Sequence, residues 1–133
     1  MVFIEWNKDL ELGFEKIDEQ HKQLIDIINR AYETSLEKDK KKRNEILNEL
    51  TEFVRVHFST EEKYFEECHY AGAEEHIEEH MGLIEKVLKF KNEFEEKDCD
   101  CEAFLTFLKE WLEEHLMVMD KKYVKSLKEC GIK

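Results

Sequence analysis

The sequence contains no proline and only four glycines in 133 residues. Proline breaks helix interiors and glycine weakens them, so their scarcity favours long, uninterrupted helices. No apolar run approaches the roughly 20 residues that a membrane-spanning helix needs, and the first residues lack the basic and apolar regions of a signal peptide. We therefore expect a cytoplasmic protein with no membrane partner, whose four cysteines are thiols.

Positive charge is also scarce, since 21 lysines and arginines face 33 aspartates and glutamates, for a net charge of −12. Such an acidic surface repels phosphates, which excludes a nucleic-acid partner. Large apolar side chains are abundant, with nine Phe, four Tyr and two Trp, and they argue against a disordered chain. The length suits one domain, so we expect residues 1–133 to form a single unit.

Apolar residues recur at steps of three and four along four segments, which predicts four helices. We expect the helices at about residues 18–37, 41–69, 73–96 and 101–129, after an N-terminal arm of residues 1–17. Short connections between helices favour antiparallel neighbours. The predicted fold class is therefore all-α, an up-down-up-down antiparallel four-helix bundle.

Histidines and carboxylates interrupt all four apolar stripes, and they all fall at one end of the predicted bundle. Side chains four residues apart lie about 40° apart on a helix, so they can approach one centre. Buried polar groups without partners cost several kcal/mol, and a metal centre is the simplest compensation. The sequence therefore predicts a metal site formed by His21, His57, Glu61, His76, His80, His115 and Asp120.

One spacing in this set does not fit a regular helix. His115 and Asp120 are five residues apart, which turns their side chains roughly 140° away from each other. They can share a centre only if it lies between them or if a π-turn widens the helix locally. A regular helix with Asp120 in solvent would exclude Asp120 as a ligand.

Five imidazoles and two carboxylates are too many for one ion but suit two ions that share the carboxylates. Mixed nitrogen and oxygen ligands are compatible with iron, and also with manganese, copper or zinc. Because the number of histidines is odd, one ion can have three and the other two. The ion with two histidines then has room for an external ligand.

These motifs resemble those of the hemerythrin family, and most closely its bacterial single-domain members. The resemblance rests on HFSTE (57–61), HIEEH (76–80) and HLMVMD (115–120), and on the arm WNKDLELGFEKIDEQH (6–21). It implies reversible binding of molecular oxygen at a non-haem di-iron centre. It also implies that one iron is held by His76, His80 and His115, that the other is held by His21 and His57, and that a hydroxide or oxide bridges the irons together with Glu61 and Asp120.

Residues beside the predicted ligands have their own predicted roles. We expect the oxygen-pocket wall to consist of Phe58, Trp111, Leu112 and Val118. Each liganding imidazole should donate its second ring N–H to a carbonyl or carboxylate, which the sequence does not identify. His69 lies off the stripe and is expected at the surface, and Cys99 and Cys101 in an ordinary loop.

The leading prediction is an oxygen-binding protein, not an enzyme, that stores or transports oxygen or delivers it to an oxygen-using enzyme. Three alternatives use the same site. They are oxygen or redox sensing, peroxide or nitric-oxide chemistry, and iron handling. The sequence leaves the oligomeric state open.

Overall fold

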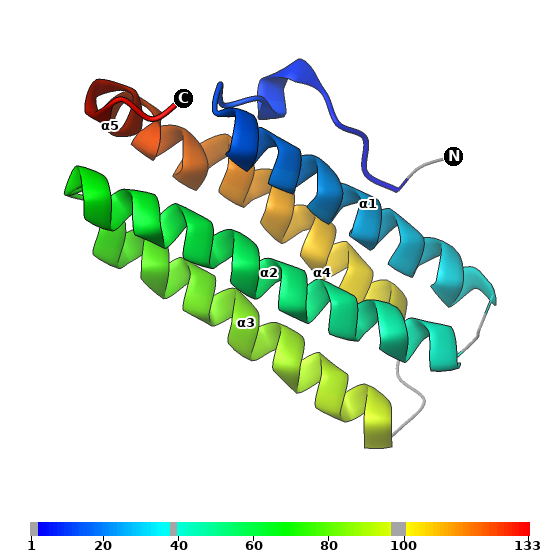
Figure 1. Cartoon of the computed structure of the whole chain (residues 1–133). Coiled ribbons are helices and arrows are strands. Elements are labelled where there is room, and N and C mark those ends of the chain that lie inside the picture. The colour runs from blue at the N-terminus through cyan, green and yellow to red at the C-terminus, as the bar shows by residue number, and fades with distance from the viewer. Residues whose placement is uncertain (1–2, 38–39, 97–100) are drawn as a thin grey trace.

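The computed structural model of the chain describes residues 3–37, 40–96 and 101–133. Four long helices lie side by side (Figure 1), which confirms the predicted four-helix bundle. The fourth is continuous but has three parts, because a π-helix separates α4 from α5. The elements in chain order are the 3-10 helix η1 (Lys8–Leu10), α1 (Glu15–Glu37), α2 (Lys40–Cys68), α3 (Ala73–Glu96), α4 (Cys101–Glu114), the π-helix η2 (His115–Met119) and α5 (Asp120–Cys130). Within the described ranges, no helix is both long and apolar enough to span a membrane.

The N-terminal arm lies along α1 (Figure 1), and α1 begins at Glu15 rather than at residue 18 as predicted. Asp18 explains the earlier start, because its carboxylate accepts the backbone N–H groups of Leu12 and Gly13 at 2.9 and 3.0 Å. Near its beginning the arm is held by Asn29, whose side chain exchanges two hydrogen bonds of 2.8 Å with the backbone of Ile4. These contacts fix the arm over the bundle.

The ends of α2 and α5 both use a left-handed residue. His69 follows α2 with φ = 50° and is exposed, as predicted for this histidine. Gly131 follows α5 with φ = 97°, a conformation that glycine adopts without steric cost. The N–H of Gly131 donates to the carbonyl of Lys128 at 3.0 Å, which closes the helix.

The apolar core has two parts, and the predicted ligands lie between them. The larger part fills most of the bundle and takes residues from α1, α2, α3 and α4, including Ile28, Leu50, Val87 and Phe104. The smaller part closes the end of the bundle beside α5 and contains Leu12, Phe14, Ile17, Phe65, Tyr123 and Leu127. A buried polar layer is thus covered by apolar side chains on both sides.

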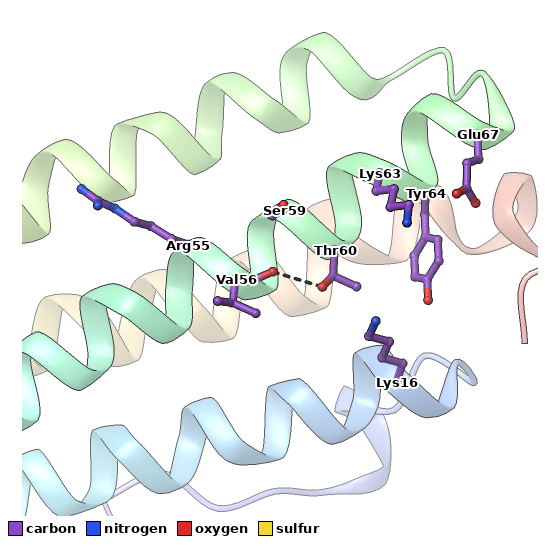
Figure 2. Close-up of a pocket in the computed structure, with 8 residues that line it drawn as sticks. All are labelled: Lys16, Arg55, Val56, Ser59, Thr60, Lys63, Tyr64 and Glu67. Carbon is purple, nitrogen blue, oxygen red and sulfur yellow. Dashed lines mark hydrogen bonds between the residues drawn. The ribbon is translucent and has the colours of Figure 1, made fainter.

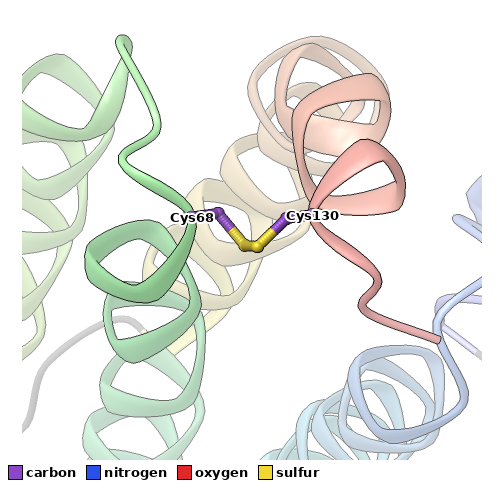
Figure 3. Close-up of a disulfide and its surroundings, with 2 residues drawn as sticks. All are labelled: Cys68 and Cys130. Carbon is purple, nitrogen blue, oxygen red and sulfur yellow. A yellow bond between two sulfur atoms is a disulfide. The ribbon is translucent and has the colours of Figure 1, made fainter.

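Cys68 and Cys130 form a disulfide that joins the end of α2 to the end of α5 (Figure 3). The prediction that these two residues are thiols is therefore wrong. They lie 62 residues apart in sequence, and only the folded bundle brings their Cα atoms to 5.6 Å. Cys99 and the side chain of Cys101 lie outside the described part of the chain.

Candidate metal centre

The structure brings all seven predicted ligands into one buried layer. Each is at most 2 % exposed, and four are fully buried. Ligand atoms of two groups lie close enough together to hold metal ions, and Glu61 belongs to both. The first group comprises Glu61, His76, His80, His115 and Asp120, and the second comprises His21, His57 and Glu61.

Asp120 lies between the two groups of histidines. Its Oδ1 is 3.0 Å from Nε2 of His76 and 3.0 Å from Nε2 of His115. Its Oδ2 is 3.2 Å from Nε2 of His21. The two oxygens of one carboxylate therefore face different sets of imidazoles, which is the placement that a bridging ligand needs.

Glu61 on α2 has a position between imidazoles that is equivalent to that of Asp120. Its Oε1 lies 3.2 Å from Nε2 of His80 and 3.4 Å from Nε2 of His57. Its Oε2 accepts a hydrogen bond from the hydroxyl of Tyr123. This contact orients the carboxylate and leaves Oε1 facing the imidazoles.

The π-helix η2 brings Asp120 to the centre. The backbone N–H of Asp120 donates to the carbonyl of His115, five residues earlier, so both side chains face the same side of the helix. Of the two arrangements that the spacing allowed, the structure has the π-turn. Asp120 is fully buried, which excludes the solvent-facing alternative. Such a turn adds one residue to the local repeat and is frequent at functional sites.

The same π-helix contradicts the predicted role of one residue of the oxygen-pocket wall. Val118 is 50 % exposed, because residues of the widened turn point in different directions from those of a regular helix. Leu116, in contrast, is 1 % exposed and packs in the larger core. The prediction of Val118 as part of the oxygen-pocket wall is therefore wrong.

Two of the other predicted wall residues stack on ligand rings. The ring of Phe58 is parallel to that of His80 with 3.7 Å between centroids, and Trp111 stacks on His115 at 4.3 Å. Leu112 is buried in the same apolar cluster as Phe58. These apolar side chains cover the faces of the His80 and His115 rings and exclude water from them.

Several buried polar atoms have no hydrogen-bond partner among the described residues. An unpaired buried polar atom costs about 1–3 kcal/mol, so a cluster of them requires a partner that the chain itself does not supply. Metal ions are such partners for neutral imidazole and carboxylate, and the residues therefore fit a two-metal centre. The unpaired atoms include Nε2 of His21, His76, His80 and His115, Oε1 of Glu61 and both carboxylate oxygens of Asp120.

Outer partners orient three of the five imidazoles. Each donates a hydrogen bond from its Nδ1–H to a side-chain oxygen, which leaves Nε2 to face the centre. The pairs are His57 with Gln20 at 2.7 Å, His80 with Glu62 at 3.2 Å and His115 with Glu79 at 2.9 Å. Nδ1 of His21 and of His76 has no such partner in the described ranges, so the predicted pattern holds for three imidazoles only.

Gln20 extends this contact from His57 to the surface. Its amide donates to the hydroxyl of Thr60 at 3.2 Å. Thr60 donates in turn to the carbonyl of Val56 at 3.1 Å (Figure 2). Thr60 lines a groove of about 510 Å³ along α2, whose wall also includes Lys16, Lys63 and Tyr64. A chain of hydrogen bonds thus fixes the orientation of His57 from the groove inward.

Burial and neighbouring charges set the protonation of the histidines. Burial lowers the pKa of His57 to about 4 and that of His80 to about 3, so both are neutral at pH 7. For His115, burial is outweighed by the charge of Asp120 and the hydrogen bond with Glu79, and its pKa rises to about 9. The pKa of Asp120 falls well below its usual range, because His115 outweighs the effect of burial. Neutral imidazole and ionised carboxylate are the forms that bind metal.

Tyr123 is a site residue that the sequence did not reveal. It is fully buried, and burial followed by the charges of Asp120 and Glu61 raises its pKa well above the usual range, so the hydroxyl remains a donor. Its position three residues after Asp120 places it one turn further along α5. That spacing was visible in the sequence, but its contact with α2 was not.

Comparisons with known proteins agree with this geometry. Residues 12–127 match the family of the hemerythrin HHE cation binding domain. A bacteriohemerythrin of Clostridium acetobutylicum is 34 % identical over 125 residues, which cover 90 % of this chain and 97 % of the relative. One of Stenotrophomonas maltophilia is 26 % identical, over 96 % of this chain and 84 % of the relative.

Solved structures share the fold. Wild-type hemerythrin superposes with a TM-score of 0.89 at 24 % identity, covering 94 % of this chain and 98 % of that one. A point mutant of hemerythrin gives a TM-score of 0.91 at 23 % identity, over 96 % of this chain and 98 % of the other. From the family match and the similarity to the Clostridium relative, the chain belongs to the hemerythrin family.

Proposed function

We propose that this protein binds molecular oxygen reversibly at a non-haem di-iron centre and stores, transports or delivers oxygen to an oxygen-using enzyme. The observation that carries the proposal is the division of five imidazoles into a set of three and a set of two, with two carboxylates between them. We expect one iron to be held by His76, His80 and His115, and the other by His21 and His57. A hydroxide or oxide would bridge them together with Glu61 and Asp120.

The asymmetry of the ligand set supports binding of a small external molecule. A pair of ferrous ions held there would supply the two electrons that reversible oxygen binding requires. The side with two histidines has one protein ligand fewer, which leaves a position for oxygen. The same protein groups thus provide both firm retention of metal and an open position.

The residues around the histidines favour a carrier over an enzyme. Phe58, Leu112 and Leu116 are at most 3 % exposed, and together with Trp111 they form an apolar wall. None of these four side chains titrates, so the wall supplies no acid that would protonate bound oxygen. A dry, apolar environment also suppresses irreversible oxidation of the metal.

The visible spectrum of the reduced, iron-loaded protein tests the proposal. We expect a charge-transfer band to appear when air is admitted and to disappear when oxygen is removed, over repeated cycles. Irreversible bleaching, or turnover of added peroxide, would instead indicate an enzyme. Iron that leaves under mild chelation without a reversible band would indicate iron handling.

Substitution of one ligand tests the division into two sets. We expect His21→Ala to lower the iron content from two equivalents to about one and to abolish the reversible band, because only two histidines hold that iron. His69→Asn is the matched control, since His69 is exposed and asparagine tolerates its left-handed backbone. Retention of two irons by His21→Ala would contradict the assignment.

A further inference from the structure

The disulfide continues a row of contacts that begins at the predicted metal ligands. On α2, Glu61, Phe65 and Cys68 follow one another at intervals of four and three residues, so they share one helix face. This face is turned toward α5. A change at Cys68 therefore acts on the same side of α2 that carries Glu61.

The face of α5 that is turned toward α2 has a similar arrangement. Asp120, Tyr123, Leu127 and Cys130 follow at intervals of three and four residues. Tyr123 donates to Glu61, its ring lies 5.3 Å from that of Phe65, and Cys130 is bonded to Cys68. The two helices are thus joined by a hydrogen bond, a ring contact and, at their ends, a covalent bond.

The two cysteine residues differ in exposure. Cys130 is exposed at the last residue of α5, whereas Cys68 is partly buried against the smaller apolar core. Figure 3 shows the bond crossing between the two helix ends. Because Cys130 is the more exposed residue, we expect a thiolate from solution to attack its sulfur.

We propose that Cys68–Cys130 is a thiol–disulfide exchange site for dithiol reductants, and that its reduction loosens α5 and speeds the loss of metal from the centre. The part that concerns metal rests on the proposed di-iron function. The part that concerns exchange and loosening of α5 does not. Neither the family resemblance nor the ligand geometry requires a disulfide at this place.

The chemistry uses one dithiol per disulfide. A thiolate of the reductant attacks Sγ of Cys130, a mixed disulfide forms, and the sulfur of Cys68 leaves as a thiolate and takes up a proton. The second thiol of the reductant then attacks its own sulfur in the mixed disulfide and releases Cys130. Two electrons pass to the protein, and the reductant becomes a disulfide.

The structural consequence follows from what remains after reduction. The contacts that then hold the end of α5 are noncovalent. They include the packing of Tyr123 and Leu127 and the hydrogen bonds of the cap at Gly131. Local opening of a helix end becomes more frequent when a covalent tie is removed. Because Asp120 begins α5 and Tyr123 orients Glu61, both shared carboxylates are affected by the same opening.

The experiment measures metal release from the ferrous protein under anaerobic conditions, with bipyridine as chelator and with or without dithiothreitol. We expect dithiothreitol to speed release about ten- to a hundredfold, as the loss of a typical disulfide tie implies. The double variant Cys68→Ser/Cys130→Ser should release iron quickly whether or not dithiothreitol is present. The matched control Cys99→Ser/Cys101→Ser should respond as the parent protein does.

Two further readouts do not depend on metal. Mass spectrometry after alkylation should show Cys68 and Cys130 linked in the air-exposed protein and both alkylated after dithiothreitol. Hydrogen exchange should accelerate in residues 120–130 on reduction, in the metal-free protein as well. Free thiols at Cys68 and Cys130 in air, or unchanged exchange in this segment, would overturn the proposal.

These readouts also separate two kinds of failure. If the oxidised protein holds no iron but its α5 loosens on reduction, the di-iron proposal fails and the exchange site stands. If it holds two irons and releases them at the same rate with or without the disulfide, the coupling to the metal centre is wrong.

Discussion

The two halves of this bundle bury their side chains equally but with opposite chemistry. In the half away from the ligands, Leu50 on α2 and Phe104 on α4 are at most 1 % exposed, and their environment is apolar. In the other half, Glu61 on α2 and Asp120 on α5 are fully buried among imidazoles. The same helices therefore pass through a conventional core and then through a layer of ionisable groups.

The two halves are therefore stabilised by different interactions. Burial of apolar surface stabilises the first half without metal and with little dependence on pH. In the second half, unpaired nitrogen and oxygen atoms oppose folding, and the proposed metal ions would compensate them. We therefore expect metal binding, pH and the disulfide to act mainly on the ligand half, and apolar substitutions to act on the other.

The largest effect is expected from Glu61→Ala. Because Glu61 belongs to both ligand groups, its removal should lower the iron content from two equivalents to less than one while the helices remain. Metal analysis after gel filtration, with circular dichroism on the same sample, measures this. Glu66→Ala, an exposed position on the same helix, should retain two equivalents. Full iron content in Glu61→Ala would show that the carboxylate is not shared.

The opposite result, a loss of stability without a loss of iron, is expected from Leu50→Ala. The cavity left by a buried leucine should lower the free energy of unfolding by about 2–5 kcal/mol, with the iron content unchanged. Urea denaturation of the metal-free protein measures the loss. Val56→Ala on the same helix is half exposed and should cost less than about 0.5 kcal/mol. Loss of iron in Leu50→Ala would mean that the two halves are not independent.

The metal-free protein should be most stable near pH 6.5. The pKa values of His57 and His80 are lowered to about 4 and about 3, so their contribution is present above pH 6.5 and is lost as pH falls toward 4. The pKa of His115 is raised to about 9, so its contribution is present below pH 6.5 and is lost as pH rises toward 9. We expect a change of a few kcal/mol on each side, measured by urea denaturation from pH 4.5 to 9.

The exposed His69 gives the control for this dependence. His69→Asn should show the same pH profile, because His69 is outside the buried layer. A flat profile in the parent protein would contradict the protonation states that we assign to the layer.

The smallest of these effects is expected from Glu79→Ala. This change removes the partner of His115 at Nδ1 but no predicted ligand, so metal affinity should fall about 10- to 100-fold. A competition titration with a chelator measures it. Glu78→Ala, at the neighbouring exposed position, removes the same charge and should leave the affinity unchanged. Equal effects of the two variants would point to net charge rather than to orientation of His115.

Spacing alone predicted the bundle and the convergence of seven polar residues, because helical periodicity fixes which side chains share a face. It also restricted His115 and Asp120 to two arrangements, because they are one residue too far apart for a regular helix, and the structure has the π-turn. It failed at Val118, because the widened turn changes the direction of every residue within it. A pattern with a constant period cannot describe a helix whose period changes.

The sequence by itself determined the helices, the antiparallel order and the set of candidate ligands, all of which depend on local periodicity and short connections. Only the tertiary structure decided which oxygen faces which imidazole, that Tyr123 orients Glu61, and that Cys68 pairs with Cys130. These contacts join residues of different helices, and their distances depend on how those helices pack. Periodicity predicts which residues share a face of one helix, whereas a contact depends on the relative positions of two helices.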